Sequence, residues 1–233
     1  MKLLTCILIL TISLLSLGCS SEEQAEKPAD QATEIQYDKN DGVVTIDLSK
    51  GMTDEGIKID YKMSDIPFNL TGEPVSVAGV TFTPAIEWTV LAPEGMKKAS
   101  FIYGPLADET DSASLNVFYF GKNSGGSVED NIERWINQIS LDSGQDPHTA
   151  AIQYEMDVDG MKTHVLSLAG VYHAPVGGPM SRAKLEKEDY RLIGIVVEAP
   201  KGNVFFKLTG PEYTARIMTE AFFTMIKTKL KKN

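Results

Sequence analysis

The chain has 233 residues, of which 42% are hydrophobic and 23% are charged, and its formal net charge at pH 7 is -10. This is ordinary globular composition, so it excludes a disordered chain, a collagen-like fibre and a protein with many membrane spans. The acidic excess also argues against nucleic acid as a partner, because duplex binding requires a basic surface.

The first 18 residues predict an export signal. Lys2 is followed by an almost wholly apolar stretch from Leu3 to Leu17. This stretch is shorter than the roughly 20 residues that a membrane-spanning helix needs, and it is typical of a secretory signal peptide.

The end of this segment, Leu15-Ser16-Leu17-Gly18-Cys19, resembles the lipobox of bacterial lipoproteins. In those proteins the cysteine thiol is acylated and becomes the new N-terminus. The resemblance therefore implies lipidation at Cys19 and a membrane anchor of two or three acyl chains. The next residue, Ser20, resembles a signal for sorting to the outer membrane, facing the periplasm. The alternative is a plain secretory signal with a chance cysteine.

The two cysteines of the chain are Cys6, inside the signal, and Cys19. The exported body therefore has neither a disulfide nor a cysteine-based metal site. Residues 20–42 are acidic and poor in large apolar side chains, so they cannot bury enough surface to fold alone. We interpret residues 19–42 as the lipidated cysteine with a flexible tether, and residues 43–233 as a single domain.

Strand-like patterns dominate the domain. They occupy residues 43–48, 57–61, 74–83 as a small hairpin, 88–91, 99–103 and 113–120. Two longer hairpins follow, one pairing 150–156 with 161–171 across 158–160, the other pairing 191–198 with 204–208. A charged loop rich in Gly and Pro is expected over 175–189.

Two helices are predicted. Ser127 and Asp130 form a capping-box pattern in front of one apolar arc, which consists of Val128, Ile132, Trp135, Ile136 and Ile139. Pro211 suits the first turn of a last helix, which ends in several lysines. Runs of antiparallel strands with few helices predict an α+β domain whose antiparallel sheet is flanked by helices.

Two stretches also resemble an uncharacterised family of bacterial, often lipid-anchored proteins. One is Gly125-Gly126 followed by Asn131-x-x-Arg134-Trp135-x-x-Gln138; the other is Tyr190-Arg191-Leu192-x-Gly194-x-x-Val197-Glu198 with Phe205-Phe206-Lys207-Leu208-Thr209-Gly210-Pro211. With Trp88, the resemblance covers about residues 75–230, and that family is distantly similar to the Mog1/PsbP/DcrB superfamily. It implies a Mog1/PsbP-like α/β/α sandwich. It implies no catalytic residues, because the superfamily consists chiefly of binding and assembly modules.

The strongest candidate ligand site is a polar stripe on the first helix. Asn131, Arg134 and Gln138 project together along the edge of the apolar arc, and Trp135 adds an aromatic wall. Such a set can bind a carboxylate or an amide, with the Arg134 guanidinium as a planar fork. The alternative is that Trp135 belongs to the core and that the three polar residues bond nearby backbone.

Patterns for metal or covalent chemistry are weak. His164 and His173 face opposite sides of a regular strand, and His148 is remote in sequence, so we predict no metal site. Ser181 and Lys184 match the Ser-x-x-Lys motif of acyl enzymes, but chance explains one such spacing, and the companion motifs are missing. We expect neither a catalytic residue nor a cofactor.

These observations predict a membrane-anchored envelope lipoprotein that acts as a non-catalytic binding or assembly module, with an envelope protein as its partner. The first alternative is a small-ligand-binding lipoprotein with a pocket beside Arg134 and Trp135. The second is a hydrolase using Ser181 and Lys184 or the Arg134 region.

Overall fold

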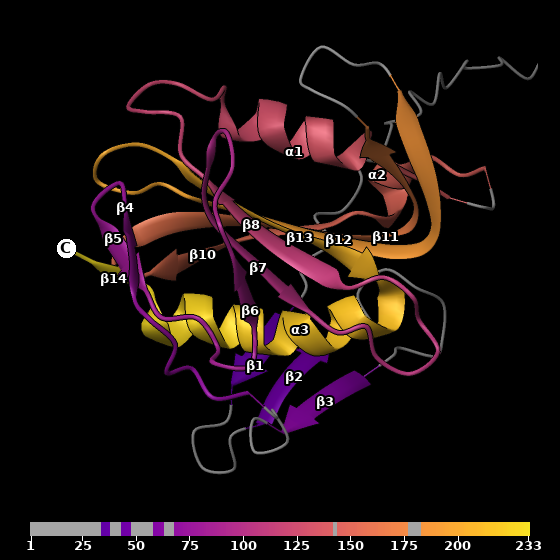
Figure 1. Cartoon of the computed structure of the whole chain (residues 1–233), viewed down its shortest axis with the longest axis horizontal. Helices are drawn as coiled ribbons and strands as arrows, with labels where there is room; N and C mark the ends of the chain where they lie inside the picture. The colour runs from indigo at the N-terminus through magenta and orange to yellow at the C-terminus, as the bar shows by residue number, and fades with distance from the viewer. Residues whose placement is uncertain (1–33, 38–42, 48–57, 63–67, 142–143, 177–182) are drawn as a thin grey trace, which may run out of the picture.

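The computed structural model of the chain describes residues 34–37, 43–47, 58–62, 68–141, 144–176 and 183–233. Their architecture is mixed α+β, and every strand pair in it is antiparallel. The largest sheet has the order β10-β11-β12-β13-β8-β7-β6, and β9 pairs additionally with β11 (Figure 1). The bounds are β6 Thr89–Leu91, β7 Lys97–Tyr103, β8 Ala113–Phe118, β9 Ile139–Ser140, β10 Ile152–Val158, β11 Met161–Pro175, β12 Lys184–Val197 and β13 Val204–Pro211.

Two small sheets accompany the large one. One has the order β1-β2-β3 and consists of Glu34–Tyr37, Val43–Asp47 and Lys58–Lys62. The other has the order β14-β5-β4 and consists of Lys231–Lys232, Val80–Phe82 and Val75–Val77. Strand β1 lies within the segment interpreted as a tether, and the remainder of that segment up to residue 42 lies outside the described residues, as does Cys19.

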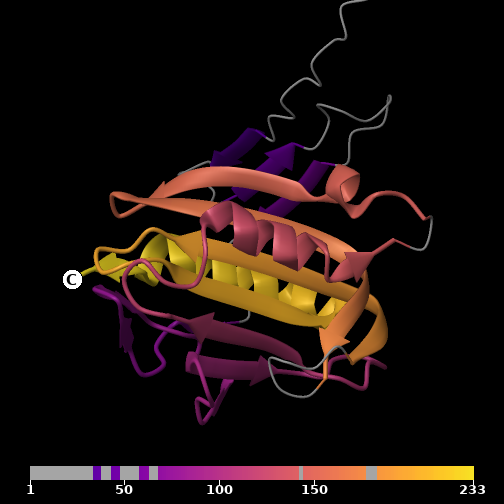
Figure 2. The same ribbon diagram turned by 90° about the horizontal axis from the view of Figure 1, so that it is seen from above.

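Side-chain alternation along the large sheet builds a core on each of its faces. In β13, Phe205 belongs to a cluster with Trp135 and Ile136 of helix α1 (Val128–Ile136). Its neighbour Phe206 belongs to a second cluster with Phe222 of helix α3 (Glu212–Thr224). Successive strand residues point to opposite faces, so the two clusters are separated by the sheet. Figure 2 shows α1 in front of the strands and α3 behind them.

Local sequence signals account for several boundaries. Ser127 and Asp130 form the predicted capping box of α1. The predicted hairpin of β10 and β11 is confirmed, and its turn residues Asp159 and Gly160 both have positive φ, as a tight two-residue hairpin turn requires. The short helix α2 (Pro147–Ala150) begins with a proline at its first turn.

The prediction of a loop over residues 175–189 is wrong for its described ends. Lys184 to Asp189 belong to β12, which pairs with β11 along its whole length except at an irregularity near Gly170 and Tyr172. Most of these residues are exposed, so they have the polar composition of a loop although their backbone is paired. Lys231 and Lys232, expected at the end of the last helix, instead pair with β5 after a π-helical turn, Met225–Lys229.

No helix in the described part of the chain has the length and apolar character needed to cross a membrane.

Candidate functional site

Trp135 of α1 is a core residue. Its side chain is 5% exposed and lies directly over Gly194 of β12, where an added Cβ would come within 2.2 Å of the indole ring. Only a glycine at residue 194 allows the helix to approach the sheet this closely. The structure therefore places Trp135 where the alternative interpretation of the polar stripe put it, in the packing between α1 and the sheet.

The Asn131 side chain ties the start of α1 to the glycine-rich turn before it. Asn131 is 2% exposed, and its amide nitrogen donates to the backbone carbonyls of Gly125 and Ser127 at 2.8 and 2.7 Å. Its oxygen accepts a hydrogen bond from Arg134, whose side chain is exposed, at 3.0 Å. Arg134, in the last turn of α1, thus bonds Asn131 one turn earlier, and no hydrogen bond between the described residues joins either of them to Gln138.

Gln138 instead bonds a residue that the sequence analysis did not select as a site. Its Oε1 accepts a hydrogen bond from Nζ of Lys207, in β13. Lys207 Nζ also donates to the Tyr172 hydroxyl at 3.1 Å and lies over the Tyr172 ring, 5.1 Å from its centroid. We call these three residues, Lys207, Gln138 and Tyr172, the Lys207 site. The sequence signals for it were Gln138 of the predicted polar stripe and a single lysine within a largely apolar strand.

The electrostatics of the Lys207 site are unusual. Lys207 is half-buried, and no described carboxylate forms an ion pair with it. Burial, assisted by the positive charge of Arg134, lowers the pKa of Lys207 from 10.5 to about 7. Desolvation destabilises the ammonium form, and its two hydrogen-bond partners are neutral, so they compensate for this only in part.

A second lysine–tyrosine pair lies beside the first. The rings of Tyr172 and Tyr190 stack at 5.9 Å, and Lys187 lies over the Tyr190 ring at 5.3 Å. Here Asp111 accepts hydrogen bonds from both Lys187 and the Tyr190 hydroxyl. The hydrogen bond to Asp111 raises the pKa of Lys187, whereas burial raises the pKa of Tyr190 to about 12.

A β-bulge brings this second pair together. Lys187 and Tyr190 are three residues apart, a spacing that would point them to opposite faces of a regular strand. The register between β11 and β12 shifts here, and Asp189 has a φ of 51°. An extra residue in one strand reverses the alternation, so Lys187 joins Tyr190 and Tyr172 on the same face.

The sheet next to the Lys207 site is also polar. In the registers of β13 with β8 and of β8 with β7, Lys207 pairs with Asn116, Thr209 with Ser114, and Asn116 with Ser100. Ser100 donates to the Asn116 oxygen at 2.8 Å, and the Asn116 nitrogen donates to Ser114 at 3.4 Å. Hydroxyl and amide groups therefore continue from Lys207 across two further strands on the face that α1 partly covers.

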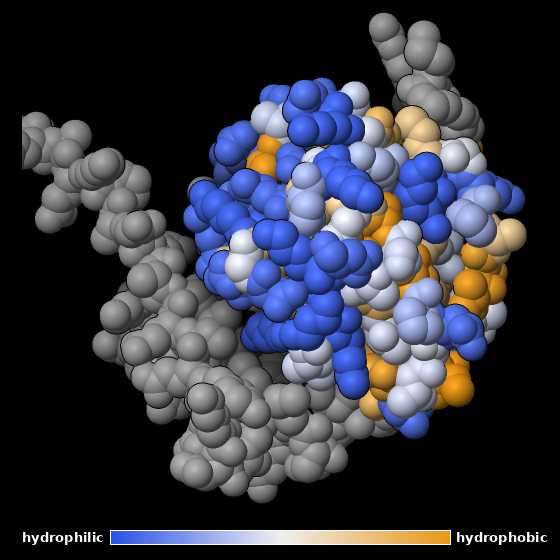
Figure 3. Space-filling model, turned by 90° about the vertical axis from the view of Figure 1, so that its left-hand side faces the viewer, coloured by the Kyte–Doolittle hydropathy of each residue, from blue (hydrophilic) through white to orange (hydrophobic). Residues whose placement is uncertain are grey.

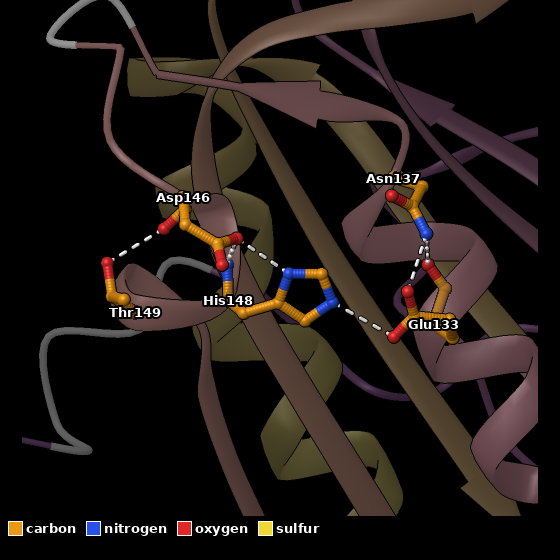
Figure 4. Close-up of polar contacts among 5 residues, drawn as sticks. All are labelled: Glu133, Asn137, Asp146, His148 and Thr149. Carbon is orange, nitrogen blue, oxygen red and sulfur yellow. Dashed lines mark hydrogen bonds and ion pairs between the residues drawn. The ribbon is translucent and has the colours of Figure 1, made fainter.

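The histidines contact carboxylate groups at separate places in the fold. Figure 4 shows His148 between Glu133 of α1 and Asp146, with its ring nitrogens 2.9 and 2.7 Å from their carboxylates. These hydrogen bonds, that of Glu133 first, raise the pKa of His148. His164 similarly contacts Glu155 and Glu198. Within the described ranges, no group of three or more His, Cys, Asp or Glu side chains has the arrangement of a metal site.

Ser181 of the Ser-x-x-Lys pattern lies outside the described residues, and Lys184 is exposed at the start of β12. No protein-family model matches the chain, and no curated protein matches it significantly. Its function is therefore inferred from its own residues and their geometry.

Proposed function

We propose that this protein is a lipid-anchored, non-catalytic binding module of the bacterial envelope, and that the Lys207 site is where it binds its ligand. The observation that carries this proposal is the half-buried Lys207, whose only described partners are the neutral Gln138 and Tyr172. A cation desolvated without a counter-ion reduces stability, and such a group is commonly retained for function.

The fold supports the same proposal. We infer a Mog1/PsbP-like α/β/α sandwich, because α1 contacts β11 and β12 while α3 contacts β8, β12 and β13. In this arrangement the main contacts of α1 with described strands are to β11 and β12 and not to β7 or β8. A sheet face partly covered by one helix provides a rigid floor on which polar groups are held in register.

Native mass spectrometry tests the binding role. The full chain would be purified from bacterial envelopes in mild detergent, as wild type and as the variants Lys207→Met and Lys187→Met. We expect wild type and Lys187→Met to retain a small molecule that Lys207→Met loses. Identical spectra for all three proteins would contradict a ligand role for Lys207.

The proposed anchor rests on the Leu15-Ser16-Leu17-Gly18-Cys19 pattern and on the acidic residues that follow it. The lipid would hold the domain at the periplasmic face of the outer membrane. Mass spectrometry of the N-terminal peptide should show an acylated Cys19, and Cys19→Ala should move the protein from the membrane to the soluble fraction. An unmodified Cys19 in membrane-bound protein would refute this mode of anchoring.

Assembly with an envelope protein is a second candidate function, favoured by strand β6. Among the described strands, β6 has a partner on one side only, and its residues Val90 and Leu91 are 68% and 40% exposed. Ile86 and Met96 nearby are also exposed. Figure 3 shows hydrophobic residues along the right-hand side of its view, which is the side that faces the viewer in Figure 1, where β6 lies.

An exposed apolar edge can pair with an extended segment of another protein. A photo-crosslinking residue at position 90 should then capture one envelope protein as a discrete band. Val90→Lys should disrupt the same contact when the crosslinker is placed at residue 91. A diffuse pattern of many products would argue against a specific partner.

A further inference from the structure

The two stacked tyrosines allow an internal comparison. Tyr190 and Tyr172 each have a lysine over the ring, at 5.3 and 5.1 Å, and each hydroxyl bonds that lysine, at 3.2 and 3.1 Å. The two pairs differ in the further partner of the lysine, which for Lys207 is the neutral Gln138 side chain. The Lys187 pair is completed by the carboxylate of Asp111, whereas the Lys207 pair has no carboxylate partner among the described residues.

The hydrogen-bond donors of Lys207 also bear on the difference between the two pairs. An ammonium group has three donors and no acceptor. The described acceptors of Lys207 are the Gln138 oxygen and the Tyr172 hydroxyl, which leaves one N–H for another group. Arg134 adds positive charge that acts on Lys207. Among its described partners, Lys207 therefore has no negatively charged acceptor.

We propose that the Lys207 site binds the carboxylate of a small organic acid, which takes the place at Lys207 and Tyr172 that Asp111 occupies at Lys187 and Tyr190. This inference rests on the proposed binding function and specifies its ligand. One lysine with one more distant arginine balances a single negative charge better than a phosphate dianion.

The surroundings indicate the rest of such a ligand. Phe118 is two residues after Asn116, so its side chain lies on the same face of β8, and it pairs with Phe205 of β13. The Phe118 ring stacks with that of Phe120 at 6.2 Å, and both residues are half-buried. An acid whose carboxylate is bonded to Lys207 can therefore place an apolar or aromatic group toward Phe118, where its burial contributes to binding.

Isothermal titration of the full chain with benzoate, acetate and inorganic phosphate tests the proposal. Benzoate should bind more tightly than acetate, because only its ring can contact Phe118. Lys207→Met should weaken benzoate binding by about tenfold or more, the usual effect of losing a hydrogen bond to a charged group. The matched variant Lys187→Met should change it by less than about threefold, since Lys187 already has Asp111 as its partner.

Proton uptake gives a second measurement that needs no folded variant. Binding to the ammonium form should take up close to one proton at pH 8 and almost none at pH 6. The titratable groups beside Lys207 do not contribute, because the pKa of Lys187 and those of the Tyr172 and Tyr190 hydroxyls are raised and that of Asp111 is lowered, so none of them changes charge over this range.

The outcomes separate this inference from the proposed function. Equal benzoate affinity of wild type and Lys207→Met, or no proton uptake at pH 8, would overturn the carboxylate proposal. Phosphate binding that depends on Lys207 in the absence of carboxylate binding would also overturn it, while leaving the binding role intact. The binding role itself fails only if no envelope molecule is retained through Lys207.

Discussion

Lys207→Met should change how the stability of the protein depends on pH. In the folded protein, burial lowers the pKa of Lys207 from 10.5 to about 7. Between these two pH values the unfolded chain binds a proton that the folded protein does not bind, so the wild type gains stability as the pH rises. Below pH 7 both states are protonated, and the folded protein bears the full cost of the buried charge. Methionine has a similar length and no charge.

The magnitude follows from the pKa. Each pH unit within the window is equivalent to about 1.4 kcal/mol, and pH 9 lies two units above a pKa of about 7. The free energy of unfolding of the wild type, measured relative to Lys207→Met, should therefore increase by about 3 kcal/mol between pH 6 and pH 9. Loss of the hydrogen bonds to Gln138 and Tyr172 affects the variant at both pH values and largely cancels in this difference.

Urea denaturation followed by the fluorescence of Trp88 and Trp135 measures this quantity, since both indoles are buried. Lys187→Met is the control, because the pKa of Lys187 is raised and its charge is constant from pH 6 to pH 9. Its stability relative to wild type should not vary with pH. If the Lys207→Met difference changed by less than about 0.5 kcal/mol, Lys207 would be a normally hydrated lysine and the reasoning about its site would be refuted.

Three further predictions concern the framework. Gly194→Ala should lower the free energy of unfolding by about 1–3 kcal/mol, because its Cβ would overlap Trp135; an unchanged urea midpoint would show that α1 can move away. Glu133→Gln should lower the pKa of His148 measured by NMR titration, since the hydrogen bond to Glu133 is the main cause of its elevation. The stabilisation by this pair is present below about pH 6.5 and is lost as the pH rises through the raised pKa. An unaltered titration curve of His148 in the variant would contradict the contact. Glu109→Ala should destabilise the protein by about 1 kcal/mol in thermal unfolding, because the Glu109 carboxylate accepts hydrogen bonds from backbone N–H groups in the first turn of α3. Glu109→Gln should keep part of the stabilisation that Glu109 provides. Equal destabilisation by the two variants would show that only the negative charge of Glu109 matters.

Sequence alone identified the elements whose causes are local. The capping box of α1 depends on two residues three apart, and the hairpin turn at Asp159 and Gly160 depends on which residues tolerate positive φ. The apolar arc that carries Trp135 follows from helical periodicity. Each of these signals lies within a few consecutive residues, so they could be recognised before the chain was folded.

The Lys207 site could not be recognised in that way. Gln138 and Lys207 are 69 residues apart, and they meet only because α1 packs across β11 and β12 and brings its end to β13. The stripe of Asn131, Arg134 and Gln138 includes one residue of the Lys207 site, but helical spacing could not show that Gln138 bonds a different partner from the other two.

Only the tertiary structure decided the environment of the two lysines. Lys187 appeared to belong to a solvated loop, yet strand pairing and a bulge place it on the Tyr190 ring, where Asp111 neutralises it. Lys207 lies on the neighbouring Tyr172 ring, where no described carboxylate pairs with it. The sequence by itself determined the residue types and the local elements. Packing determined the desolvation and the counter-ions, because the charge state of a lysine depends on groups that reach it from distant parts of the chain.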